Sequence, residues 1–161
     1  MQGQELWSTG KHTLNCYASA ENRIVDKYYY IAEDVINHMT VVMIGSDALA
    51  AVAVQDKIRI IDNKGSMLYQ TQLDAHVTCF DVQEAPTKNG FPLLVFGTKS
   101  GNIGAIELTI DEAIVLWETD YQFENKSIVT HVKVASLKDG VNNICLTRDD
   151  GSIEIYSFTE R

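Results

Sequence analysis

The sequence is poor in basic residues, which argues against one class of partner. Its 161 residues include 13 Lys and Arg against 22 Asp and Glu, and the formal net charge is −9. A surface that binds duplex nucleic acid needs clustered Lys and Arg, and an acidic surface is repelled by anionic lipid. We therefore predict that nucleic acid is not a partner of this chain.

Long apolar runs and a cysteine framework are also missing. No run approaches the roughly 20 apolar residues of a membrane-spanning helix, and residues 1–5 do not begin a signal peptide. Cys16, Cys79 and Cys145 are far apart and odd in number, so a disulfide framework is not expected. We predict three buried, unpaired thiols and a reducing compartment.

Residue patterns for catalysis or metal binding are sparse. The histidines His12, His38, His76 and His131 are scattered, without the spacing of a zinc protease or an accompanying Cys pair. Ser, His and Asp are all present, but a triad is defined by geometry, and no Gly-x-Ser-x-Gly elbow occurs. We predict no catalytic, cofactor-binding or metal-ligating residue and no small-molecule substrate.

Residues 97–101 contain Lys-Ser and have to be compared with a phosphate loop. Such a loop needs Gly directly before the Lys and a second Gly five residues earlier, so that backbone N–H groups surround the phosphates. Those places hold Thr98 and Leu93. We interpret the segment as a hairpin turn instead.

A calcium site is the second alternative, at residues 138–143 together with Asp149 and Asp150. Calcium requires six to eight oxygen ligands, and the upstream loop offers one carboxylate, that of Asp139. Asp in a hairpin turn usually accepts hydrogen bonds from its own backbone. The sequence therefore predicts turn residues here rather than ligands.

Internal repetition is the most informative feature of the sequence. Residues 94–103 and 144–153 share an apolar run, a polar turn and a second run, and they align Gly101 with Gly151. This pattern predicts two β-hairpins with Gly at a positive-φ position of each turn. Residues 49–61 form a shorter third copy.

The strands on either side of these hairpins repeat as well. Residues 77–82 match 129–134, and residues 67–71 match 115–119. One unit thus holds about four strands in about 45 to 50 residues, which is typical of a propeller blade. Residues 111–118 are the best helix candidate, but they occupy the outer-strand place of the repeat and are predicted as strand.

We therefore predict an all-β fold, a partial β-propeller of four-stranded antiparallel blades, with about three blades and part of a fourth. Residues 24–31 are expected to close one blade and residues 35–42 to begin the next. Residues 1–161 would form a single domain, an excerpt of a larger propeller. Tyr28–Tyr30, Tyr69 and Trp117 are expected to pack between blades rather than to form a binding patch.

Three segments carry a resemblance to a known family: residues 93–103, 115–118 and 146–158. With residues 54–58 and 29–31 in the same order, they resemble the amino-terminal propeller of the Bardet–Biedl syndrome protein seven family, over roughly residues 28–158. The resemblance implies a subunit of the BBSome, a coat-like complex that carries membrane proteins in and out of cilia. It implies a scaffold without enzymatic activity, and it supplies no binding residues to transfer.

The partners implied by this resemblance are other BBSome subunits and, indirectly, ciliary membrane cargo, in the cytoplasm, the cilium and its basal body. The sequence leaves three other functions open. They are a propeller scaffold of another coat or of intraflagellar transport, a calcium-dependent adhesion-type propeller, and a propeller enzyme with its site at the channel mouth.

Overall fold

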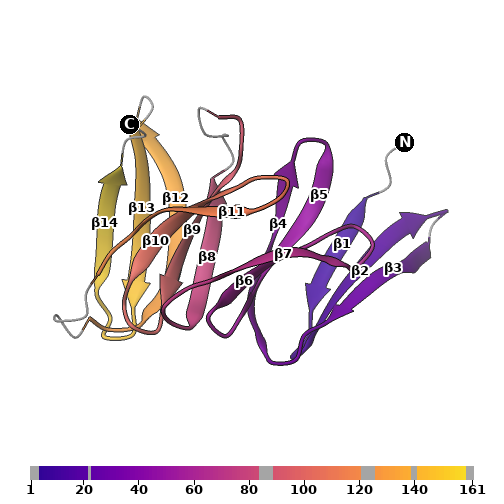
Figure 1. Cartoon of the computed structure of the whole chain (residues 1–161), viewed down its shortest axis with the longest axis horizontal. Helices are drawn as coiled ribbons and strands as arrows, with labels where there is room; N and C mark the ends of the chain where they lie inside the picture. The colour runs from indigo at the N-terminus through magenta and orange to yellow at the C-terminus, as the bar shows by residue number, and fades with distance from the viewer. Residues whose placement is uncertain (1–3, 22, 84–88, 121–125, 139–140, 159–161) are drawn as a thin grey trace.

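The computed structural model describes residues 4–21, 23–83, 89–120, 126–138 and 141–158, and this part of the chain forms fourteen β-strands. The strands pair into four antiparallel sheets that follow one another along the chain (Figure 1). Within the described residues, no helix is long and apolar enough to cross a membrane.

The first sheet contains β1 (Glu5–Thr9), β2 (Thr13–Ala20) and β3 (Arg23–Ile31). The second contains β4 (Ile36–Ile44), β5 (Asp47–Val54), β6 (Lys57–Ile61) and β7 (Met67–Gln72). The third contains β8 (Val77–Gln83), β9 (Leu93–Thr98), β10 (Ile103–Leu108) and β11 (Ala113–Glu118). The fourth contains β12 (Val129–Lys138), β13 (Val141–Arg148) and β14 (Ile153–Phe158).

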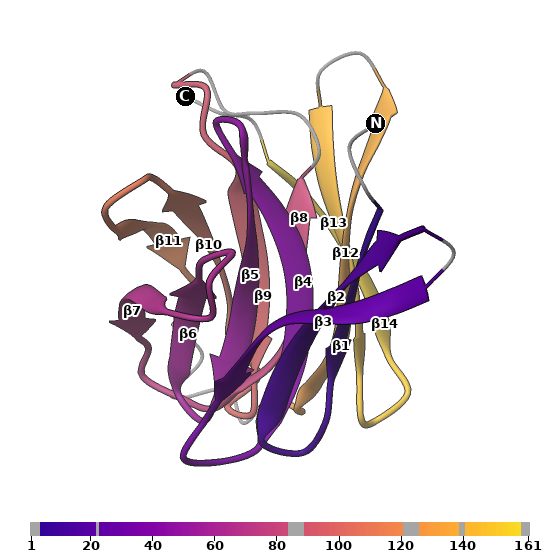
Figure 2. The same ribbon diagram turned by 90° about the vertical axis from the view of Figure 1, so that its right-hand side faces the viewer.

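The sheets are arranged as propeller blades, with successive inner strands side by side. Strand β8 packs beside both β4 and β12, so these three are the inner strands, and β7 and β11 are the outer strands of the two four-stranded blades. Strand β3 leads into β4 as β7 leads into β8, so β3 is also an outer strand. Figure 2 shows β7 and β11 next to each other on the outside of the molecule.

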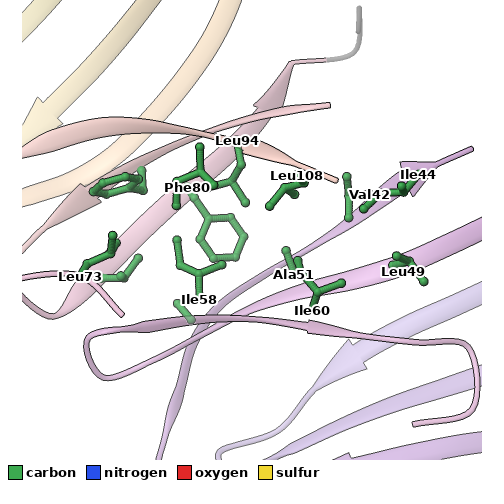
Figure 3. Close-up of a cluster of buried hydrophobic side chains, with 14 residues drawn as sticks. Val42, Ile44, Leu49, Ala51, Ile58, Ile60, Leu73, Phe80, Leu94 and Leu108 are labelled. Carbon is green, nitrogen blue, oxygen red and sulfur yellow. The ribbon is translucent and has the colours of Figure 1, made fainter. Parts of the chain in front are cut away.

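A separate hydrophobic core fills each space between neighbouring blades. The core between the second and third blades contains the large buried side chains Ile58, Ile60, Phe80 and Phe96 (Figure 3). Successive residues of one strand face opposite cores, as Ile60 and its neighbour Ile61 do. Central strands such as β5 and β9 are therefore buried on both faces, which explains their nearly continuous apolar sequences.

The predicted all-β partial propeller is confirmed, including β11 as a strand and β3 as the strand that closes a blade. The described residues divide into two four-stranded and two three-stranded sheets. The amino-terminal part, whose repeat is weak in sequence, forms a blade like the others. Its first turn, between β1 and β2, is closed by Gly10 N–H, which donates to Thr13 O at 2.8 Å.

Candidate functional site

The segment that resembles a phosphate loop is a hairpin turn between β9 and β10. Gly101 has φ +87°, and its N–H donates to Thr98 O at 3.2 Å. A Cβ at Gly101 would lie 2.6 Å from the Cβ of Lys126 and 2.9 Å from the carbonyl oxygen of Ser127. The turn is thus packed against the chain leading into the next blade, and Gly101 serves the turn geometry.

The matching turn of the fourth blade uses its carboxylate for its own backbone. Gly151 also has φ +87°. Asp150 accepts hydrogen bonds from Ser152 N and from Ser127 Oγ, each at 2.8 Å, and the bonds from Ser152 lower the pKa of Asp150 to about 2. The prediction of positive-φ glycines in both turns is confirmed, and Asp150 acts as a turn residue.

The calcium hypothesis also involves residues 138–143. Asp139 lies outside the described residues, and the side chains of residues 136–142 are not described. Within the described residues, no group of three His, Cys, Asp or Glu side chains could hold a metal ion.

The four histidines do not form a common site in the described structure. His12 and His76 precede β2 and β8 in connecting segments, and the backbone oxygen of each accepts a hydrogen bond from a neighbouring segment, Ala32 N at 2.8 Å and Lys99 N at 2.9 Å. His38 lies on β4 and His131 on β12, separated by β8.

Polar contacts join the three inner strands. The His38 ring packs edge-on against Phe80 with ring centroids 4.6 Å apart, and burial lowers the pKa of His38. Asp81 on β8 accepts a hydrogen bond from Val134 N at 2.9 Å and forms an ion pair with Lys133 at 3.0 Å. These contacts hold neighbouring blades together, and their carboxylate and ammonium groups are occupied with each other.

A buried arginine connects the first and second blades. Arg59 of β6 is only 6% exposed. It binds Glu33 through both terminal nitrogens, donates to Tyr30 Oη at 2.8 Å and donates to Gln70 Oε1 at 3.0 Å. Hydrogen bonds from Arg59 lower the pKa of Glu33 to about 2. This pairing of a buried guanidinium with a bidentate carboxylate is the structural use for which Arg is suited.

A second buried arginine connects the third and fourth blades. Arg148 is 4% exposed and donates to Glu154 from Nε at 2.9 Å and from a terminal nitrogen at 3.1 Å. Its other terminal nitrogen donates to the backbone oxygens of Gly101 at 2.9 Å and Ser127 at 2.7 Å. Both arginines stabilise blade junctions, and neither was singled out from the sequence.

Tyr69 and Trp117 pack between blades, as predicted, and Tyr30 contacts Arg59 of the second blade, whereas Tyr29 is 66% exposed, so the prediction is wrong at Tyr29. Tyr28 packs edge-on against Trp7 at 5.4 Å, and Trp117 packs against Phe158 at 6.3 Å. Tyr69 Oη donates to Thr109 O at 2.7 Å, and burial raises the pKa of Tyr69 to about 12.

The thiols follow the prediction in two of three cases. All three cysteines are unbonded, and Cys16 and Cys79 are buried, which raises the pKa of both. Cys145 is half-buried, so the prediction that each thiol is buried is wrong at this position. Cys145 pairs with Ile155 on the face of the fourth blade that points away from the third.

Sequence reasoning missed the apolar outer surface of the two four-stranded blades. Six exposed hydrophobic residues lie on β7, on β11 and in the turn that precedes β11: Met67, Leu68, Ile110, Ile114, Val115 and Leu116. We call four of them, Leu68, Ile110, Val115 and Leu116, the rim strip. Its signal in the sequence is the loss of alternation in the pairs 67–68 and 115–116, where two apolar residues follow one another.

These observations define a segment of a β-propeller whose polar and aromatic side chains mainly join blades, and whose outer strands carry exposed apolar residues. The chain belongs to the BBS7 beta-propeller family, whose model matches residues 1–161. The match extends the resemblance seen from residue 28 onward to the first blade.

Known relatives agree with this assignment. The chain is 24% identical over 160 residues to the mouse protein described as BBSome complex member BBS7, covering 98% of this chain and 22% of the mouse protein. The chain therefore spans less than a quarter of that relative's length.

Two crystal structures of BBS1N in complex with ARL6DN share the fold. The lead-soaked structure has a TM-score of 0.73 and 17% identity, and the match covers 97% of this chain and 50% of that one. The mercury-soaked structure has a TM-score of 0.75 and 13% identity, with 99% and 44% covered.

Proposed function

We propose that this chain is an interaction scaffold within a BBSome-type complex, and that it holds other subunits in place without catalysing a reaction. The observation that carries the proposal is the family match over the whole chain, residues 1–161. Its partners are other BBSome subunits, and ciliary membrane cargo is reached through them. The site of action is the cytoplasm, the cilium and its basal body.

The chemistry of the described residues supports a scaffold. The groups on the inner strands, which would line the channel of a propeller enzyme, are engaged with one another, as Asp81 is with Lys133 and Val134 N. The two buried arginines join blades rather than face an open site. A rigid propeller with large outer surfaces is suited to multiple protein contacts.

The test is affinity capture of the full-length parent protein from ciliated cells, with an unrelated acidic propeller of similar size as the control. We expect other BBSome subunits to be recovered with the parent and not with the control. Recovery of a different coat or of intraflagellar-transport subunits instead would replace the proposal by the second scaffold function. Recovery that disappears with a calcium chelator would support the adhesion-type function.

A further inference from the structure

The outer strands of the two four-stranded blades differ from an edge that merely faces water. Exposed edges are usually protected by charged residues, Pro or a bulge, and these two strands combine a bulge with large exposed apolar side chains. Here Leu68 is 47% exposed and Leu116 is 48% exposed, and the exposed Val115 precedes Leu116 on β11. Ile110 lies beside them, because its neighbour Thr109 accepts a hydrogen bond from Tyr69 of β7.

This exposure does not come from the three-stranded sheets at either end. β7 and β11 each complete a blade, and each pairs with a neighbour in its own sheet. Val115 pairs with Ile106, which belongs to the core between the second and third blades, so Val115 faces β7. Ile114 faces the opposite way, toward the three-stranded fourth sheet. Met67 pairs with Ile61 of the core between the first and second blades, so it faces the three-stranded first sheet, and both residues are left out of the rim strip for that reason.

Both outer strands carry a β-bulge at the same place. The register of β7 with β6 shifts so that Leu68 has no partner, between Met67 opposite Ile61 and Tyr69 opposite Ile60. The register of β11 with β10 shifts in the same way at Leu116. A bulge twists an edge and interrupts the regular row of free N–H and C=O groups, so it disfavours the addition of a strand. Contacts through side chains are favoured instead.

The charges that flank β11 have one sign. Residues 109–120 contain Asp111, Glu112, Glu118 and Asp120 and no Lys or Arg. Asp111 and Glu112 are exposed at one end of β11, and Glu118 lies at the other end near Asp74. The apolar residues of β11 thus lie between two acidic groups.

Resting on the proposed function, we infer that the rim strip binds an amphipathic helix of another subunit. The apolar face of this helix covers Leu68, Val115 and Leu116. Lys or Arg residues of the helix meet the acidic ends of β11. A helix satisfies its own backbone, so it needs no free strand edge, and it presents a continuous apolar face to such a surface. Basic residues beside that face complement Asp111, Glu112 and Glu118.

The first test is photo-crosslinking in the full-length parent assembled with its partner subunits. A photoreactive residue replaces Leu116 in one sample and Met43 in the control, since Met43 is exposed on the inner strand β4. We expect position 116 to crosslink to a segment of another subunit with helical apolar spacing and flanking Lys or Arg, and position 43 not to do so. A crosslink to a second copy, to an acidic segment or to no subunit would overturn the inference.

The second test is the double variant Leu68→Lys and Leu116→Lys, with Met43→Lys as the matched control and circular dichroism to verify the fold. We expect the affinity for the crosslinked subunit to fall about tenfold or more in the double variant, as it does when central apolar contacts are removed. If the wild-type parent recovers BBSome subunits and the double variant recovers them equally, the inference fails and the proposed function stands. If the wild type recovers none, the proposed function itself fails.

Discussion

The guanidinium of Arg148 donates a hydrogen bond of 2.9 Å to the backbone oxygen of Gly101, which joins the fourth blade to the turn of the third. The same nitrogen donates to Ser127 O at 2.7 Å, while the rest of the group binds Glu154. One side chain thus fixes the hairpin turn of one blade, the connecting segment and the third strand of the next blade.

We expect Arg148→Met to be among the most destabilising substitutions in the chain. It would leave the partly exposed Glu154 carboxylate and two backbone oxygens without their donor, and each buried acceptor left unsatisfied costs about 1–3 kcal/mol. The free energy of unfolding is measured by denaturant titration. Lys133→Met is the control, since Lys133 is 73% exposed in its pair with Asp81 and should change stability by less than about 1 kcal/mol. Equal effects of the two substitutions would contradict the structural role of Arg148.

The two turn glycines are expected to differ although their φ angles agree. A Cβ at Gly151 has no neighbour within 4 Å, so Gly151→Val should cost only the strain of a positive φ, about 1–3 kcal/mol. A Cβ at Gly101 meets Lys126 and Ser127 in addition. Gly101→Ala should therefore destabilise more than Gly151→Ala. A neutral Gly151→Val, measured by thermal and denaturant unfolding, would show that the hairpin register is wrong.

These glycines also show what the sequence can reveal. A hairpin turn is local, so the polar residues and Gly between two apolar runs predict it correctly at Gly101 and Gly151. The partners of Arg59 and Arg148 come from other blades, so no local pattern identifies them. The one local feature of the sequence that indicates a buried Arg59 is its position between two apolar residues, Ile58 and Ile60.

The buried or exposed face of a strand is harder to predict than the strand itself. Ile58, Ile60, Ile153 and Ile155 follow the same alternation, and the sequence predicts that some of them lie on open blade faces. Ile58 and Ile60 are buried between the second and third blades, so they are not among those residues. Ile153 and Ile155 are exposed, because no described blade covers that face of β14. Alternation defines the two faces of a strand, and only the neighbouring blade decides which of them is covered.

The Glu33–Arg59 pair predicts a pH dependence of stability. The pKa of Glu33 is lowered to about 2 in the folded chain, so the charged form is favoured by folding. This contribution is fully present above the ordinary pKa of 4.5 and is lost as the pH falls from about 5 to about 2. Because the Glu33 side chain is 57% exposed, solvent screening keeps the effect small.

The measurement is the melting temperature of wild type and Glu33→Gln between pH 7 and pH 2. We expect the wild type to melt higher at pH 7 and the difference to disappear as the pH approaches 2. A difference that stays constant over this range would show that protonation of Glu33 does not weaken the contact with Arg59.

Self-association of the isolated 161-residue chain is the last prediction. Ile153 and Ile155 are 75% and 62% exposed on the same face of β14, and Leu6 and Ile31 are exposed on the first sheet. Exposed apolar surface of this kind favours association, so we expect light scattering to detect species larger than the monomer. Ile153→Ser together with Ile155→Ser should reduce them, while Leu116→Ser on the rim strip should not. A monomer with a sharp melting transition would contradict the prediction, and a reduction by Leu116→Ser alone would assign the association to the rim strip.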